Sequence, residues 1–308
     1  MPPVVGADSL LVLRHRNRTA SDPRALQRRA ASGELTRLRS GAYVARAVWA
    51  TLRAEDRRRL EAAAMTEQHA SYRASHRTAG ALWRIPSLHR HDGVVDARVT
   101  AAAGSRTEHG VRKHAVRDID QHLAVVDGIT CTTIERTALD LAATESFAEA
   151  VVALDHVLKH VTESRLHEVL EEWNPVRGRR RIEAVLAFAD ARSGSAGESW
   201  SRVQIDEAGL VAPMLQEPFL DPDGLIGLVD FWWPGANRIG EFDGLKKYKE
   251  AQLLAGRSPG DVVAEEKVRE DRLRATATEP AVSRWIWRTL LTGGALARQL
   301  VAAGVPRR

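Results

Sequence analysis

An aspartate inside an apolar segment restricts how the carboxyl-terminal third of this chain can fold. Residues 225–233 have the composition of a buried β-strand, and Asp230 interrupts them. Eleven residues further on, Glu241 and Asp243 stand on alternate positions around Phe242. Because side chains of a strand alternate between its two faces, Glu241 and Asp243 are predicted to share one face. Two adjacent strands can thus bring Asp230 and Glu241 close together, with Asp243 as a further candidate.

These carboxylates need a partner, because like charges repel and an unpaired buried charge is costly. A divalent cation resolves both problems, and oxygen ligands favour Mg²⁺ or Mn²⁺ over zinc. Such an ion activates water and stabilises a phosphoryl transition state. A lysine can assist, and the candidates are Lys246, Lys247 and Lys267. The alternative for any single acid is a turn-forming or solvent-facing side chain, but the complete set favours a metal site.

The amino-terminal segment carries the positive charge of the chain. The net charge is +5, and the first sixty residues hold thirteen Arg, no Lys and five acidic residues. Residues 24–31 predict a helix that ends at Gly33, and residues 35–39 and 42–44 predict a hairpin. This order is typical of a winged helix, in which the helix enters the major groove and the wing follows the phosphates. The alternative is an ordinary basic surface helix beside a hairpin. The predicted DNA contacts are Arg24, Gln27, Arg28, Arg29, Arg37 and Arg39.

The middle of the chain predicts a mixed α/β region without a recognisable chemical motif. The predicted elements are a helix over 56–74, strands over 94–100, 111–115 and 123–126, and helices from 132 to about 169. The histidines match no compact metal-ligand spacing, which favours solvated or hydrogen-bonded roles. The single cysteine, Cys131, is predicted to be a buried, inert thiol.

Three domains are predicted in the 308 residues. A proline-, glycine- and arginine-rich segment at 174–181 marks a boundary. The predicted domains are a winged helix over 1–50, a mixed α/β domain over 51–175 and a small α/β domain over 176–308. In the last domain we expect helices over 181–191, 198–209 and 263–275, and strands over 215–218, 226–232, 238–242 and 282–287. The charge of helix 263–275 is expected to be mostly solvated.

No window approaches the roughly 20 apolar residues of a membrane helix, and the amino terminus lacks a signal-peptide pattern. We therefore expect a cytoplasmic protein with no membrane contact.

A set of short motifs in the carboxyl-terminal third resembles a known family. The motifs are Gly197-Glu198-Ser199, Leu215-Gln216, residues 227–234, residues 240–244 with Lys247-Tyr248, and residues 266–274. Through them, residues 186–290 resemble the domain of unknown function 559, a relative of the very-short-patch-repair endonucleases in the PD-(D/E)XK nuclease superfamily. The resemblance implies a restriction-endonuclease-like fold in which Asp230 and Glu241 hold the metal and Glu198 completes the site. Where the superfamily pattern places a lysine, this chain has Asp243. Either Lys247 or Lys267 replaces that lysine in space, or Asp243 is a ligand.

Residues 33–44 and 133–140 carry a second, looser resemblance, to the amino-terminal region of actinobacterial proteins with an AbiEi-like type IV toxin–antitoxin antitoxin domain. Together the two resemblances imply a DNA-binding protein that hydrolyses phosphodiesters with Mg²⁺ or Mn²⁺. The implied catalytic residues are Asp230, Glu241, Asp243, Lys247 and Glu198. The alternative is an antitoxin-type transcriptional regulator whose nuclease-like domain does not cut, with a cognate toxin or a second copy of the chain as a further partner. A third hypothesis, a protein-interaction module at the Trp-rich carboxyl end, is weaker because these tryptophans fit core strands better.

Overall fold

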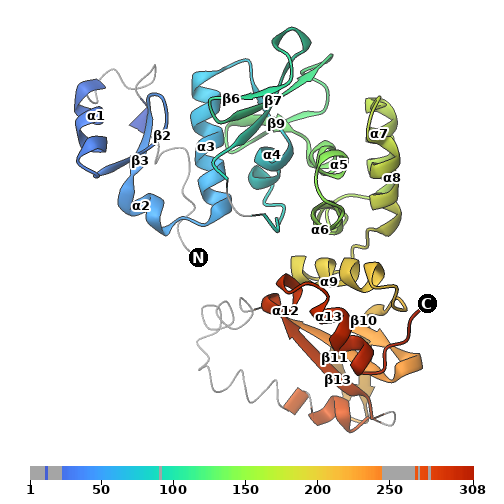
Figure 1. The fold of residues 1–308 in the computed structure, drawn as a ribbon. Helices are drawn as coiled ribbons and strands as arrows, with labels where there is room; N and C mark the ends of the chain where they lie inside the picture. Colours follow the sequence, from blue (N-terminus) through green and yellow to red (C-terminus); the bar gives the residue numbers. More distant parts are fainter. Residues whose placement is uncertain (1–10, 13–22, 90–91, 245–267, 270, 277–278) are drawn as a thin grey trace. The chain divides into compact units, whose positions relative to one another are not determined.

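The computed structural model describes residues 11–12, 23–89, 92–244, 268–269, 271–276 and 279–308 (Figure 1). These residues form a mixed α/β protein with helices and several β-sheets, as the coarse α/β class predicted from the sequence requires. Among them, no helix is both long and apolar enough to cross a bilayer.

The described residues form two compact units. The N-terminal unit comprises Met1–Ser146 and His160–Leu186, and the C-terminal unit comprises Phe147–Lys159 and Ala187–Arg308. The predicted boundary at 174–181 therefore lies within the N-terminal unit. No sequence pattern had indicated that residues 147–159 pack with the carboxyl-terminal part. Helix α6 (Phe147–Val157) connects residues 147–159 to the carboxyl-terminal part. It contains Asp155, a buried carboxylate, and Oδ2 of Asp155 accepts a hydrogen bond at 2.8 Å from Arg202 of the C-terminal unit.

The N-terminal unit begins with a helix and a small sheet, as predicted. Its elements are β1 (Leu11–Val12), α1 (Pro23–Ala31), β2 (Leu35–Arg39), β3 (Ala42–Ala45) and α2 (Arg46–Thr51). The strands form an antiparallel sheet in the order β1-β3-β2. Leu26 of α1 packs against Leu35 and Tyr43 of the hairpin. Burial of these side chains fixes which face of α1 turns away from the hairpin.

A six-stranded sheet in the order β6-β7-β5-β4-β9-β8 follows in the same unit (Figure 1). The elements are α3 (Ala54–Gln68), β4 (Arg73–Ala74), α4 (His76–Leu82), β5 (Val95–Thr100), η2 (Ala101–Ala103), β6 (Arg106–Glu108), β7 (Val111–Val116), β8 (Leu123–Val126), β9 (Ile129–Thr132), α5 (Ile134–Thr144), α7 (Glu163–Trp173) and α8 (Arg179–Phe188). Apolar residues of α3 and α4 pack with Val95, Ala97 and Val111 of the sheet. Because β5 alternates, Asp96 and Arg98 point to its other face, where both are nevertheless buried.

Two differences between the structure and the sequence prediction in this unit concern strands β4 and β9. The helix predicted over 56–74 ends at Gln68, because Ala74 is paired with Ala97 and Cys131 inside the sheet. Strand β9 was not predicted, although the two-residue turn Asp127-Gly128, with φ of 50° and 76°, is a strong hairpin signal. The prediction for Cys131 is confirmed: the thiol is buried, and burial raises its pKa to about 12.

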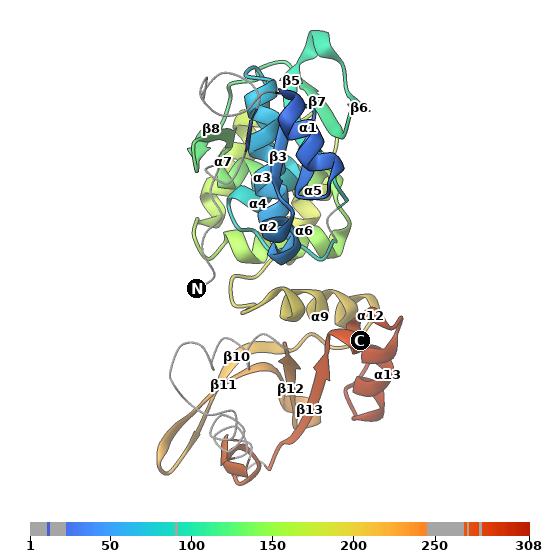
Figure 2. The same cartoon turned by 90° about the vertical axis from the view of Figure 1, so that its left-hand side faces the viewer.

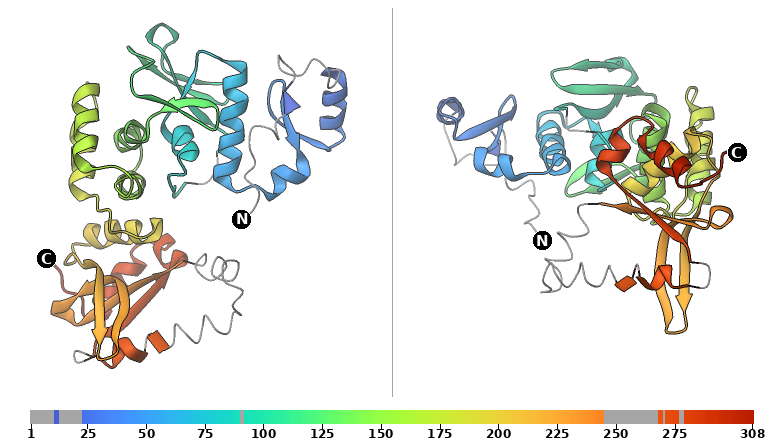
Figure 3. Two further views of the ribbon diagram at one scale, coloured as in Figure 1. Left: turned by 180° about the vertical axis from the view of Figure 1, so that it is seen from behind. Right: turned by 60° about the horizontal axis from the view of Figure 1, so that its bottom comes forward.

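The C-terminal unit contains a four-stranded mixed sheet in the order β10-β11-β12-β13 (Figure 2). Its elements after α6 are α9 (Ala196–Glu207), β10 (Met214–Asp221), β11 (Gly224–Trp233), η3 (Pro234–Ala236), β12 (Arg238–Asp243), β13 (Ala281–Ile286), α12 (Trp287–Leu291) and α13 (Ala295–Ala302). Strands β10, β11 and β12 are antiparallel, whereas β13 runs parallel to β12. The strands β10 and β11 form a long two-stranded hairpin (Figure 3).

From α9 to β13, the order of the described elements agrees with the sequence prediction, whereas α12 and α13 were not predicted. Of the predicted helix 263–275, residues 268–269 and 271–274 are helical, and residues up to 267 lie outside the described part. Trp233 and Trp285 are buried in the core beside Phe231, whose ring centroid lies 5.2 Å from that of Trp285. These two tryptophans therefore stabilise the sheet, which argues against an interaction surface built from them.

Candidate functional site

Asp230 is a buried acid on a central strand. Phe231 of β11 is paired with Gly240 of β12, and the two strands are antiparallel. Asp230, one residue before Phe231, therefore lies next to Glu241, one residue after Gly240. The Oδ2 atom of Asp230 accepts a hydrogen bond at 2.8 Å from the backbone N–H of Phe242. Asp230 is only 5% exposed. The strand register therefore brings Asp230 and Glu241 together, as the alternation of the sequence predicted.

Glu198 is oriented by the first turn of α9. The Ser195 hydroxyl accepts a hydrogen bond from the Glu198 backbone N–H and donates one to Oε1 of the same residue at 2.8 Å. The backbone N–H of Gly194 donates to Oε2 at 2.6 Å. This arrangement is close to a capping box, and it holds a carboxylate at the positive end of the helix dipole. A capping role alone would explain a glutamate here.

Gln216 connects Glu198 with Asp230, and the sequence had suggested no role for it. Its Nε2 atom lies 3.1 Å from Oε2 of Glu198 and 3.4 Å from Oδ1 of Asp230. Its φ of 51° is in the left-handed region, which is uncommon for a residue other than glycine and is often found at functional sites. The bridge shows that the side chains from α9 and β11 meet at one point. The motif Leu215-Gln216 was the available signal.

Glu241, the third acid, is 6% exposed and contacts a cation from the helical segment between β12 and β13. Arg269 Nη2 donates to Oε1 of Glu241 at 3.1 Å and to the carbonyl of Leu228 at 2.8 Å. Arg272 likewise pairs with Asp221 on the β10–β11 hairpin. These two arginines make internal ion pairs, whereas the sequence had suggested mostly solvated charge for this segment.

Asp243 occupies a different environment from the other three acids. Its side chain is 30% exposed, and its Oδ2 lies 3.9 Å from Nη1 of Arg284 on β13. Asp243 is thus more exposed than Glu198, Asp230 and Glu241, and it lies at the edge of this set of acids. The candidate lysines Lys246, Lys247 and Lys267 lie outside the described residues. Among the described side chains, no group of three or more Asp, Glu, His or Cys has a metal-holding arrangement.

The six residues predicted to contact DNA fall into two groups. Arg24, Gln27 and Arg28 are exposed on α1 and Arg37 is exposed on β2. Arg29 and Arg39 are partly buried and contact other residues of the chain, and the exposed Arg37 also donates from Nε to the carbonyl of Arg39 at 3.3 Å. The guanidinium of Arg29 forms a 2.9 Å hydrogen bond with Glu34, and Arg39 donates to the carbonyls of His109 and Gly110 at 3.1 and 2.8 Å. Burial lowers the pKa of Arg39. Arg39 therefore links the hairpin to the six-stranded sheet.

Comparisons with known proteins give two partial similarities. Uncharacterized protein MT2308 and Uncharacterized protein Rv2248, from two strains of Mycobacterium tuberculosis, are each 32% identical to this chain over 131 residues. The matched region covers 42% of this chain. It covers 48% of each relative, so the chain spans about half the length of these relatives. The crystal structure of the RV2827C protein of the same species aligns with 67% of this chain and 78% of its own, with a TM-score of 0.36 and 15% identity. No model of a protein family matches the chain.

Proposed function

We propose that this chain is a DNA-binding protein whose C-terminal unit is a PD-(D/E)XK-type nuclease that hydrolyses DNA phosphodiesters with Mg²⁺ or Mn²⁺. The observation that carries the proposal is that Gln216 bridges Glu198 of α9 and Asp230 of β11, while the strand register places Glu241 of β12 next to Asp230. The order of one helix, a three-stranded meander and a parallel fourth strand supports it.

The chemistry of the donor atoms fits a hard divalent cation. Asp230 and Glu241 are adjacent, almost fully buried carboxylates. The hydrogen-bond partners of Asp230 within the described residues, the Phe242 N–H and the Gln216 amide, are both uncharged. A buried carboxylate with neutral partners retains its charge at a high cost, which a bound cation would offset. We infer that Asp230 and Glu241 would hold the ion and that Glu198 would complete its coordination.

Within this proposal, each residue has a distinct task. A bound Mg²⁺ would lower the pKa of a water molecule and stabilise the charge of the phosphoryl transition state. Gln216 holds Glu198 and Asp230 at a fixed separation, and the Ser195 cap fixes the approach of Glu198. Arg269 balances the charge of Glu241. A phosphate oxygen would be stabilised by Lys247 or Lys267, the positions that the family resemblance suggests.

The direct test is a cleavage assay with the full-length protein on supercoiled plasmid and on single-stranded DNA. We expect nicking or cutting with Mg²⁺ or Mn²⁺ and none in excess EDTA. If folded protein leaves both substrates intact with either ion, the nuclease proposal is wrong.

A transcriptional regulator of the antitoxin type, without cleavage, is the second candidate. Two observations favour it: Asp243 stands where the superfamily pattern places a lysine, and Arg269 forms an ion pair with Glu241. In this case the carboxylates serve the fold, and the exposed arginines of α1 and β2 serve DNA binding. DNA binding that is undiminished by EDTA, together with no cleavage, would select this candidate.

Arg28 and Arg39 should respond differently to replacement by alanine. Arg28 is exposed, so Arg28→Ala should weaken DNA binding and reduce the slope of log K against log salt by about 0.9, the value for one phosphate contact. Arg39→Ala removes two charged hydrogen bonds inside the protein, so it should lower the free energy of unfolding by roughly 1.5–3 kcal/mol. Fluorescence anisotropy at several salt concentrations and urea unfolding would measure the two effects. An unchanged salt slope for Arg28→Ala would contradict the predicted role of α1.

A further inference from the structure

A cavity of about 560 Å³ lies in the N-terminal unit, in a part of the chain for which the sequence suggested no chemistry. Its walls come from β5, β7, α4, α5, the end of α7 and the segment 174–178. A volume of this size is typical of sites for small molecules. None of the carboxylates of the proposed nuclease site lines it, so a ligand site in this cavity is independent of the nuclease proposal.

Positive charge dominates the lining of the cavity. Four arginines line it (Arg98, Arg117, Arg136 and Arg177), against the two acids Asp118 and Asp140. Arg98 and Arg136 are almost completely buried, at 1% and 2% exposure. Burial lowers the pKa of Arg98 to about 10, and the positive charge of Arg136 is the second largest cause of this shift. Two buried guanidinium groups that line the same cavity favour the binding of an anion there.

The two buried guanidinium groups are held rigidly but retain unused donors. Arg98 donates through Nη1 to the carbonyl of Gln121 at 2.7 Å and through Nη2 to that of Asp118. Arg136 donates through Nε to Asp140 at 2.9 Å, and its guanidinium carbon lies 3.8 Å from the ring centroid of Trp173. Within the described part of the chain, Arg98 Nε and Arg136 Nη1 have no hydrogen-bond partner. Buried donors of a charged group are rarely left unpaired, because the desolvation cost is high.

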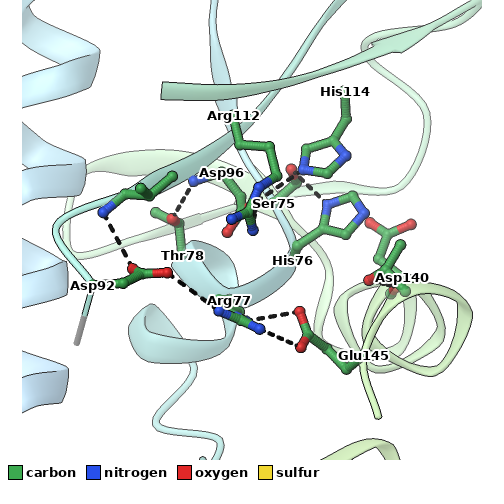
Figure 4. Close-up of polar contacts among 12 residues, drawn as sticks. Ser75, His76, Arg77, Thr78, Asp92, Asp96, Arg112, His114, Asp140 and Glu145 are labelled. Atoms are coloured by element: carbon green, nitrogen blue, oxygen red, sulfur yellow. Dashed lines mark hydrogen bonds and ion pairs between the residues drawn. The ribbon is translucent and has the colours of Figure 1, made fainter. Parts of the chain in front are cut away.

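An unused acceptor accompanies these donors. The Oδ2 atom of Asp140 is buried and has no hydrogen-bond partner among the residues that the structure describes. Beside it lies a histidine pair, His76 and His114, whose rings stack with centroids 3.6 Å apart, as Figure 4 shows. Burial, opposed by Asp140, lowers the pKa of His76 to about 4, so this ring is neutral at pH 7. The cavity thus offers strong donors for an anionic group and a carboxylate acceptor for a hydroxyl group.

We propose that the cavity lined by Arg98, Arg136 and Asp140 binds a small phosphate ester that carries hydroxyl groups, such as a sugar phosphate or a nucleoside monophosphate. The planar fork of a guanidinium matches the oxygens of a phosphate group, which favours phosphate over a simple halide. The exposed arginines Arg117 and Arg177 lie at the margin of the cavity and add long-range attraction for the dianion. The carboxylate of Asp140, which lines the cavity, would accept a hydrogen bond from a ligand hydroxyl.

Isothermal titration calorimetry of the full-length protein would test this proposal with three probes: inorganic phosphate, ribose 5-phosphate and adenosine monophosphate. We expect saturable binding of at least one ester and weaker binding of inorganic phosphate, which lacks the sugar hydroxyl groups. The double variant Arg117→Ala/Arg177→Ala should bind the ester about two- to tenfold more weakly at low salt, since exposed charges attract the dianion only weakly and are screened by salt. Both positions are exposed, so the variant should fold.

Arg180→Ala is the matched control, because Arg180 is an exposed arginine on α8 that does not line the cavity. Its affinity for the ester should equal that of the unmodified protein. Arg136→Lys, which keeps the charge but loses the planar fork, should also weaken binding about tenfold while the protein remains folded by circular dichroism. Three results would overturn the proposal: no saturable heat with either ester, equal affinity for inorganic phosphate, or an equal loss in Arg180→Ala. A protein that binds DNA at this cavity but binds neither ester would also contradict a small-molecule site.

Discussion

Replacement of Asp230 by asparagine should reduce Mg²⁺-dependent DNA cleavage by on the order of a thousandfold, since a bound ion contributes several kcal/mol to transition-state stabilisation. Asparagine keeps the shape of the side chain, and its amide oxygen can still accept the Phe242 N–H. The change therefore removes the negative charge while it leaves the strand intact. Initial rates of plasmid nicking would measure the effect, and thermal unfolding would show that the variant is folded.

Asp223→Asn provides the matched control for this experiment. Asp223 is exposed in the turn of the β10–β11 hairpin, and the same chemical change there removes a charge at a distance from the carboxylates. Its cleavage rate should stay within about twofold of the unmodified protein, because surface substitutions seldom disturb a fold. If Asp230→Asn and Asp223→Asn cut equally well, Asp230 holds no catalytic ion, and the regulator becomes the better proposal.

Gly197→Ala should destabilise the C-terminal unit, although alanine is the better helix former by about 1 kcal/mol. Gly197 lies in the first turn of α9, and an added Cβ would overlap the ring of Phe242 on β12. That ring is in turn packed edge-on against Trp287, with centroids 5.2 Å apart, so it has little room to move. Overpacking of this kind costs about 1–3 kcal/mol. The melting temperature should fall by about 2–12 °C, since each kcal/mol lowers it by about 2–4 °C in a unit of this size, as differential scanning calorimetry would measure.

The control for Gly197→Ala is Gly235→Ala. A Cβ at position 235 meets no atom within 4 Å, and the residue is exposed in the short helix η3. This variant should unfold within about 1–2 °C of the unmodified protein. A melting temperature that rises in Gly197→Ala would show that helix propensity outweighs the contact with Phe242, and that α9 does not pack tightly on β12.

Local patterns were sufficient to predict most strands and helices of the C-terminal unit. The alternation around Asp230 and Glu241 predicted their shared face, because a strand has only two faces and the register of an antiparallel pair follows from them. In the N-terminal unit, the helix predicted over 24–31 with its end at Gly33 and the hairpin predicted over 35–39 and 42–44 correspond to α1 and to β2–β3. Strand β9 was missed although the turn Asp127-Gly128 indicated it, so this error came from an overlooked local signal.

Other features depend on partners that are distant in the sequence. Arg39 lies on an alternating basic strand, a position typical of a DNA contact. Only the packing of residues 109–110 beside this strand makes Arg39 a link between the hairpin and the six-stranded sheet. Arg269 belongs to a charged helix whose pattern indicates solvation, yet the fold places it on Glu241. The same applies to α6, whose partner is α9 because Asp155 and Arg202 pair across 47 positions of sequence.

The sequence alone determined the residue types that can form a carboxylate site and the strands that carry them. Local propensity and the two-residue period of a strand depend on neighbours in the chain, so a pattern indicates them directly. Tertiary structure alone decided that Gln216 joins Glu198 to Asp230 and that Asp243 stays at the edge with Arg284. It also decided that Arg98 and Arg136 meet around one cavity. These outcomes depend on which elements pack together, and the free energy of that packing comes from the burial of the whole core rather than from any local segment.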